Sequence, residues 1–166
     1  MELNMKSEWL IFILIILAIL FLALFMSKLK SSPIHNVPPA NFKAILNNEN
    51  ADTALEISPT GYMQGTINPA RNSLDYLILM QGLSTPPTKI YFTDKTGKVV
   101  KTLNKGFKQA EGMDNVWYMH DTWNQTGVEP LSRDTVLKML NNEIAVHVAT
   151  NINRNREISG AVVKQV

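Results

Sequence analysis

The most pronounced feature of the hydropathy pattern is a run of 18 apolar residues, 9–26, without a polar position inside it. An α-helix rises about 1.5 Å per residue, so the run covers roughly 27 Å, close to the ~30 Å hydrocarbon core of a bilayer. A buried core helix would show a polar stripe, and a cleaved signal peptide would be shorter and end in small residues. The run instead ends in bulky residues at 24–26, where cleavage would need small ones, so the pattern predicts an uncleaved transmembrane helix.

Aromatic and basic residues at the edges of the run are of the kinds that anchor a helix at the membrane interface. The residues that we assign to the membrane anchor, at the edges and inside the run, are Trp9, Phe12, Ile16, Phe21, Phe25, Lys28 and Lys30. Two lysines follow the run and Lys6 precedes it, which favours a cytosolic domain because positive charge is retained on the inner side. The absence of cysteine agrees with this side, whereas a glycosylation sequon at Asn124 points to the other. The bias is small, and it predicts a cytosolic-facing domain.

Composition divides the chain into four parts: an N-terminal tail over 1–8, the transmembrane helix over 9–26, a linker over 27–40 and one domain over 41–166. The linker contains serines and a Pro38-Pro39 pair that cannot continue a helix, so we expect an extended spacer. The 126 residues that follow are enough for a single hydrophobic core.

Inside the domain, apolar residues recur at every second position and turn residues interrupt them at short intervals, which is typical of β-strands. The segments with this pattern are 42–46, 61–67, 74–80, 89–93, 98–103, 116–120, 143–150 and 157–163. Ser132 is expected to cap a short helix over 133–140. In 74–80 even Leu77 and Leu79, on the second face, are apolar, so we expect a central strand covered on much of both faces. The predicted fold is an immunoglobulin-like antiparallel β-sandwich with one short helix.

The C-terminal part of the domain carries a motif, VHVAT at 146–150 followed after a polar turn by REISG at 156–160. This arrangement is similar to the C-terminal signature of the CHRD domain, a family named after the repeats in chordin. The resemblance extends in the family's order over nearly all of 41–166. The family-motif residues are Val148, Thr150, Glu157, Ile158 and Gly160.

The chain departs from the family at positions that bear on function. CHRD domains commonly carry a His-x-His pair on a middle strand and a histidine before the threonine of the motif. The corresponding residues here are Lys89, Tyr91 and Ala149, and His147 stands where the family usually has asparagine. The resemblance therefore implies a retained scaffold, and if the family's histidines bind a metal, this chain has lost them.

The remaining residues give little indication of chemistry. Only three histidines and no cysteine are present, whereas zinc or copper requires three or four converging nitrogen or sulfur ligands. No serine or threonine lies in a nucleophile motif, and no glycine-rich phosphate loop occurs. Sixteen basic and 14 acidic residues form no basic cluster of the kind that binds nucleic acid. We therefore expect no enzyme activity, no metal or other cofactor, and no nucleic-acid partner.

Trp123 is the strongest candidate for a contact with a partner protein. It lies in a predicted loop, where an exposed tryptophan would be a typical binding anchor, and its burial would remove it from consideration. Arg154 and Arg156, in the polar connection between the last two predicted strands, complete the candidate contact.

Two functions remain compatible with the sequence. The first is a non-enzymatic structural protein, in particular a minor virion protein whose anchor sits in an internal membrane and whose domain docks against a capsid protein or another layer protein. Sixteen asparagines, as expected from an AT-rich genome, and the cytosolic bias support it. The second is a cell-surface or periplasmic ligand-binding CHRD module, which requires the domain to lie outside the cell. Both functions have a lipid bilayer as a partner.

Overall fold

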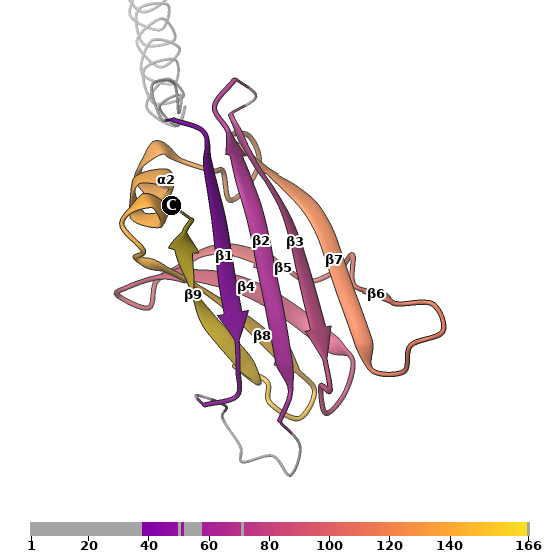
Figure 1. Cartoon of the computed structure of the whole chain (residues 1–166). Coiled ribbons are helices and arrows are strands. Elements are labelled where there is room, and N and C mark those ends of the chain that lie inside the picture. Colours follow the sequence, from indigo (N-terminus) through magenta and orange to yellow (C-terminus); the bar gives the residue numbers. More distant parts are fainter. Residues whose placement is uncertain (1–37, 50, 52–57, 71, 166) are drawn as a thin grey trace, which may run out of the picture. The chain divides into compact units, whose positions relative to one another are not determined.

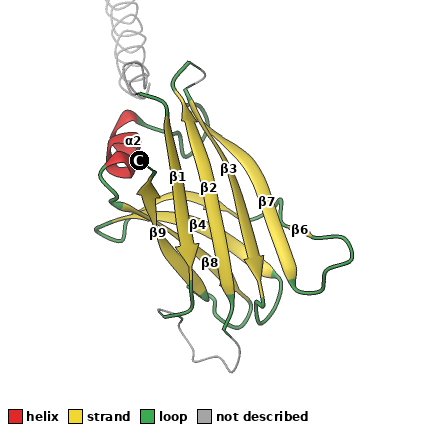
Figure 2. Cartoon of the chain, in the orientation of Figure 1, coloured by secondary structure: helices red, strands yellow, loops and turns green. Residues whose placement is uncertain are grey.

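Alternating apolar and polar side chains build nine strands in the described part of the domain, shown in Figures 1 and 2. The computed structural model describes residues 38–49, 51, 58–70 and 72–165. In chain order the elements are β1 (Ala40–Leu46), β2 (Thr60–Asn68), β3 (Ser73–Gln81), β4 (Pro87–Asp94), β5 (Val99–Leu103), β6 (Lys108–Gln109), β7 (Val116–Asn124), α2 (Arg133–Leu140), β8 (Ile144–Thr150) and β9 (Ile158–Lys164).

The predicted transmembrane helix over 9–26 and most of the linker over 27–40 lie outside the described residues, so both stay predictions. Within the part of the chain that is described, no helical segment has the length and apolar character that crossing a bilayer requires. Strand β1 begins at Ala40, directly after the Pro38-Pro39 pair. The linker therefore leads straight into the first strand.

The strands form two facing layers, which β9 joins. Their order is β5-β4-β8-β9-β1-β2-β3-β7-β6, and every pairing is antiparallel. We call β1, β2, β3, β7 and β6 layer A, and β5, β4, β8 and β9 layer B. In Figure 1, β1, β2, β3 and β7 lie in front of β4, β5 and β8. The predicted antiparallel β-sandwich with one short helix is confirmed for the described residues.

The strand order differs from the immunoglobulin-like prediction. In an immunoglobulin domain the third strand lies in the opposite sheet from the first two. Here β1, β2 and β3 follow one another in the same layer, and the chain first changes layer between β3 and β4. A tight turn holds β2 and β3 together, because Asn72 adopts φ 51 and its N–H donates to the Pro69 carbonyl. The alternating pattern sets which face of a strand is buried but not which strand is its neighbour.

The core lies between the layers and is centred on three aromatic rings. Phe92 of β4 lies edge-to-face against Tyr76 of β3, with ring centroids 5.8 Å apart, and its centroid is 5.5 Å from that of Trp123. All three side chains are fully buried. Such ring pairs stabilise a core beyond their buried area by about 0.5–1.5 kcal/mol each. Layers A and B are therefore joined by aromatic packing as well as by β9.

Helix α2 begins and ends as the sequence predicts. Ser132 is the N-cap residue, and its hydroxyl accepts the Thr135 N–H at 3.0 Å. Val136 and Met139 are buried against the sheet, whereas Leu137 is 44% exposed. The helix is thus short and amphipathic, and its apolar face covers the sandwich.

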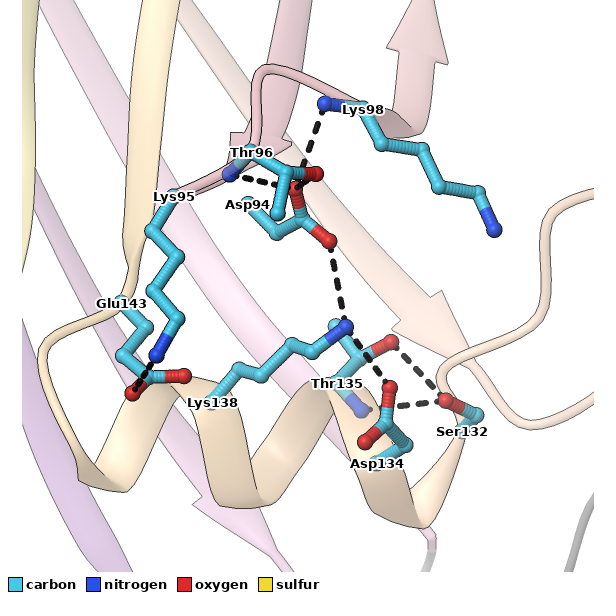
Figure 3. Close-up of polar contacts among 9 residues, drawn as sticks. All are labelled: Asp94, Lys95, Thr96, Lys98, Ser132, Asp134, Thr135, Lys138 and Glu143. Atoms are coloured by element: carbon cyan, nitrogen blue, oxygen red, sulfur yellow. Dashed lines mark hydrogen bonds and ion pairs between the residues drawn. The ribbon is translucent and has the colours of Figure 1, made fainter.

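Polar contacts fix α2 to the turn between β4 and β5 (Figure 3). Asp94 accepts hydrogen bonds from the Thr96 hydroxyl at 2.6 Å and N–H at 3.0 Å, and from the Lys98 N–H at 3.2 Å. Its second carboxylate oxygen accepts a bond from Lys138 of α2 at 3.1 Å. The hydrogen bond from the Thr96 hydroxyl has the largest effect on the pKa of Asp94, and the bond from Lys138 the next largest. Both hold the pKa below its ordinary value. Asp94 therefore connects the turn between β4 and β5 to the helix.

Candidate interaction surface

An apolar row crosses the outer face of layer A, which faces the viewer in Figure 1. Strand register places Ile45 beside Tyr62, Tyr62 beside Leu79, and Leu79 beside Tyr118. The first three are 69%, 39% and 41% exposed, and Tyr118 is half-buried. The outer face of an antiparallel sandwich is normally polar, and a contiguous exposed apolar patch is typical of an interaction site. We call these four residues the apolar row.

The apolar residues of the row are visible in the sequence, but the sequence alone favours a different interpretation of them. Leu79 is an apolar residue on the second face of β3, and the pattern therefore predicts a strand covered on both faces. The structure leaves the outer face uncovered at Leu79, so the prediction of a doubly covered strand is wrong there. Ile45 and Tyr62 likewise stand at solvent-facing positions of their strands. The three strands become one surface only through their register, which the sequence does not state.

A shallow saddle of about 470 Å³ lies beside the apolar row on the same face. Its floor is backbone, because Phe42 and Tyr76 line it while their side chains are buried inward. The side chains that surround it are mainly polar. They include Asn41, Tyr62, Gln64, Asp75, Leu77 and His120.

Trp123 is not part of any exposed surface. It lies in β7 rather than in a loop, is 1% exposed, and donates its indole N–H to the Glu129 carbonyl at 2.8 Å. The prediction of an exposed binding anchor is therefore wrong. The polar residues after Trp123 indicate a loop, but β7 extends to Asn124 because it pairs along its whole length with β3.

Glu157 is fully buried, and neutral groups of Ser84, Thr150 and Asn153 donate hydrogen bonds to its carboxylate. Ser84 donates its N–H at 2.6 Å and its hydroxyl at 2.5 Å, Thr150 donates its hydroxyl at 2.5 Å, and Asn153 donates its side-chain amide at 3.4 Å. The Glu157 N–H itself donates to the Val148 carbonyl at 2.7 Å. A buried carboxylate is tolerated when hydrogen bonds replace its hydration. This Glu157 network ties the β3–β4 loop to the end of β8 and to the β8–β9 connection.

Gly160 lies where β9 passes against β1 and joins the two layers. A Cβ atom at this position would overlap the carbonyl oxygen of Ile45 and lie 2.8 Å from its carbonyl carbon. One residue before it, Ser159 and Asn47 exchange two backbone hydrogen bonds of 2.9 and 3.1 Å. Only glycine allows the two backbones to approach so closely.

The model of the CHRD domain family matches residues 42–162 of the chain. The match covers well over half of the 166 residues. The chain belongs to the CHRD family. A search of the curated proteins found no match, and a search of the solved structures also found none. The five motif residues of this CHRD domain are Val148 and Ile158 in the core, Thr150 and Glu157 in the Glu157 network, and Gly160 at the layer junction, so each serves the fold.

Lys89, Tyr91 and Ala149, where the resemblance led us to expect histidine, lie on the paired strands β4 and β8, and Ala149 is fully buried. Tyr91 stacks on His147 with ring centroids 4.8 Å apart, and the Lys89 amine lies 4.8 Å from the centre of the Tyr91 ring. His147 Nε2 shares a hydrogen bond of 2.9 Å with the Thr93 hydroxyl. A packed aromatic pair thus occupies this part of the surface.

His120 and His147 are not neighbours, because His120 lies on the outer face of layer A and His147 on that of layer B. Across the described residues, no three His, Cys, Asp or Glu side chains are grouped as metal ligands. Arg154 is exposed and Arg156 is half-buried close to His147, in the connection between β8 and β9. With Trp123 buried in the core, the three predicted contact residues do not form one surface, and a role for the two arginines stays a prediction.

We expect His147 to make the domain sensitive to acid. Burial, and next the positive charge of Arg156, lower the pKa of His147 to about 4. An unfolded histidine has a pKa of about 6.5, so as the pH falls the unfolded state binds a proton first. The stabilising contribution of neutral His147 is fully present above pH ~6.5 and is lost as the pH falls towards ~4; at pH ~4.5 the loss amounts to about 2–3 kcal/mol.

The measurement is the urea midpoint of the full chain at pH 7 and at pH 4.5. His147→Gln, which keeps a hydrogen-bonding group towards Thr93 but does not titrate, is expected to reduce the difference between the two midpoints. His120→Gln, at an exposed position of layer A, serves as the control and leaves that difference as in the wild type. Equal pH dependence in wild type and His147→Gln would show that His147 is not the group responsible.

Proposed function

We propose that the chain is a non-enzymatic interaction protein, held at a bilayer by the helix over 9–26, whose domain contacts a partner protein through the apolar row. The exposure of Ile45, Tyr62 and Leu79 as neighbours on one sheet face is the observation that carries this proposal. Hydrophobic and aromatic residues at the centre of a patch supply most of the binding energy of protein interfaces. The motif residues of the family are engaged within the fold, which leaves the apolar row as the surface with the strongest tendency to bind.

The specific form that we propose is a minor virion protein that links an internal membrane to a capsid shell. The two lysines after the apolar run favour a cytosolic-facing domain, and the absence of cysteine and the high asparagine content agree with this origin. A linker of 14 residues, 27–40, would give the domain reach above the bilayer. Purified particles that contain the chain in a fixed ratio to a capsid protein would support this form, and particles that lack it would overturn it.

Membrane anchoring is tested by alkaline carbonate extraction of the full chain. We expect the wild type to stay in the membrane pellet and the double variant Ile16→Arg/Phe21→Arg to move to the supernatant. Each arginine near the middle of a transmembrane helix disfavours insertion by about 2.5–3.5 kcal/mol. Val37→Arg, in the linker, is the control and stays in the pellet. Extraction of the wild-type chain would contradict the anchor.

Protease protection of sealed membranes then gives the side of the domain. Digestion of 41–166 from the cytosolic side supports the connector function. Protection from the cytosolic side together with a glycan on Asn124, which is exposed at the end of β7, would support the alternative function instead.

That alternative is a cell-surface or periplasmic ligand-binding CHRD module. The saddle favours this alternative. A concave site that is surrounded by polar side chains and one aromatic side chain fits a small ligand better than it fits the flat surface of a partner protein. The two functions use neighbouring but separable residues of layer A, which allows them to be tested independently.

A further inference from the structure

The saddle has the size and the construction of a ligand site. Its volume of about 470 Å³ lies within the range of ~300–1,000 Å³ that is usual for small-molecule sites. It is built on three paired strands, β1, β2 and β3, with His120 contributed by β7 and with Gln165, which follows β9 and donates its N–H to the Asn41 carbonyl at 2.8 Å. Side chains on paired strands are held more firmly than those on loops, so the arrangement does not depend on a flexible segment.

Two of the polar side chains around the saddle are oriented by their neighbours. The Thr66 hydroxyl donates to the Asn41 side-chain carbonyl at 2.9 Å, which leaves both amide hydrogens of Asn41 as donors. The Thr122 hydroxyl donates to one carboxylate oxygen of Asp75 at 2.7 Å, which leaves the other oxygen as an acceptor. A fixed donor and a fixed acceptor therefore face the same hollow.

Gln64 and His120 add groups that both donate and accept hydrogen bonds. Hydroxyl groups of a ligand likewise donate and accept, so a polyhydroxylated molecule matches this mixture better than one with acceptors only. Tyr62 and Leu77 supply an aromatic and an apolar contact for the C–H groups of such a molecule. The lining thus combines the two kinds of contact that a sugar ring offers.

The charge of the saddle excludes anionic ligands. Among the described residues that line it, none is lysine or arginine, and Asp75 is the one acidic residue. Phosphate and carboxylate groups are usually bound by arginine, lysine or clustered backbone N–H groups, and here they would meet a carboxylate of the same sign. A neutral ligand remains.

We propose that the saddle binds a neutral saccharide. This inference goes beyond the protein contact proposed for the apolar row. Tyr62 borders both surfaces, whereas Gln64, Asp75 and His120 belong to the saccharide site alone and Ile45, Leu79 and Tyr118 to the protein contact alone. Either surface functions without the other.

The test is saturation-transfer NMR on the full chain in lipid nanodiscs, because sugar-based detergents would compete for the site. The probes are D-glucose, N-acetyl-D-glucosamine and maltotriose, with glucose 6-phosphate as the charged comparison. We expect at least one neutral probe to bind saturably with a dissociation constant of about 1 mM, and the phosphate to bind more weakly. Gln64→Ala and His120→Ala are each expected to weaken that binding about fivefold, as the loss of one hydrogen bond implies.

Gln109→Ala, an exposed glutamine of β6 outside the saddle, is the matched control and leaves binding unchanged. Leu79→Asp, in the apolar row, also leaves saccharide binding unchanged. The inference is overturned if no neutral probe binds saturably up to roughly 50 mM, if glucose 6-phosphate binds as tightly, or if Gln64→Ala and His120→Ala both bind like the wild type. Failure here would leave the protein contact of the apolar row untouched, because that contact is measured separately, by cross-linking from position 79 and its loss in Ile45→Asp.

Discussion

Gly160→Ala is expected to prevent stable folding of the domain. The added methyl group would overlap the Ile45 carbonyl oxygen and lie 2.8 Å from its carbonyl carbon, and backbone of a paired strand cannot move aside as a side chain can. Relief would require β9 to separate from β1, at the junction of the two layers. Destabilisation above about 4 kcal/mol is a large part of the stability of an ordinary domain. The measurement is the thermal unfolding of the full chain by near-ultraviolet circular dichroism.

Gly65→Ala is the graded comparison for Gly160→Ala. A methyl group at Gly65 would lie 3.1 Å from a terminal methyl of Leu74 and 3.2 Å from Tyr76 Cβ, so side-chain adjustment relieves part of the strain. We expect a loss of about 1–3 kcal/mol, with the domain still folded. If Gly160→Ala melted within a few degrees of the wild type, the result would contradict the close approach of the β9 backbone to β1.

Glu157→Ala is expected to destabilise the domain by about 3–5 kcal/mol. The substitution leaves the Ser84 N–H and the hydroxyls of Ser84 and Thr150 without their acceptor in a buried site, and each buried unpaired group costs about 1–3 kcal/mol. It also opens a cavity, which adds to the loss. Glu157→Gln keeps the volume but turns donors towards donors, so about 2 kcal/mol is expected. Urea unfolding of the full chain at pH 7 measures both variants.

Glu143→Gln is the matched control for the Glu157 network. Glu143 pairs with Lys95 at 2.7 Å on the surface, where an ion pair contributes at most about 1 kcal/mol. We expect its urea midpoint to stay close to that of the wild type. Equal losses of stability for Glu143→Gln and Glu157→Gln would mean that the hydrogen bonds to the buried Glu157 carboxylate do not stabilise the fold more than a surface ion pair does.

Local structure is largely predictable from the sequence because it depends on neighbouring residues. The period of two locates eight of the nine described strands, and Ser132 marks the first turn of α2, where its hydroxyl accepts the Thr135 N–H. The remaining strand, β6, has only two residues, Lys108 and Gln109, and so carries no period. Helix α2 packs only one face on the sheet, so Val136 and Met139 are buried while the apolar Leu137 is 44% exposed.

The arrangement of residues that depends on strand register and on the packing of the two layers cannot be predicted from neighbouring residues in the sequence. Trp123 has polar neighbours in sequence, yet the packing of β7 on β3 places it against Phe92 of the other layer. The apolar row consists of residues that stand 17 or more positions apart along the chain, and only strand pairing makes Ile45, Tyr62 and Leu79 adjacent. The motif residues are recognisable in sequence, but the partners of Glu157 include Ser84, which no motif indicates.

The most direct test of the proposed function is photo-cross-linking of the full chain in membranes or particles of its source. Benzoylphenylalanine placed at Leu79, in the apolar row, is compared with the same probe at Leu137, which lies on α2 and is similarly exposed, 44% against 41%. We predict one discrete protein adduct from position 79 that Ile45→Asp abolishes, and no such adduct from position 137. The absence of an adduct from position 79, or the same adduct from both positions, would contradict the assignment of the apolar row as the contact surface of this CHRD domain.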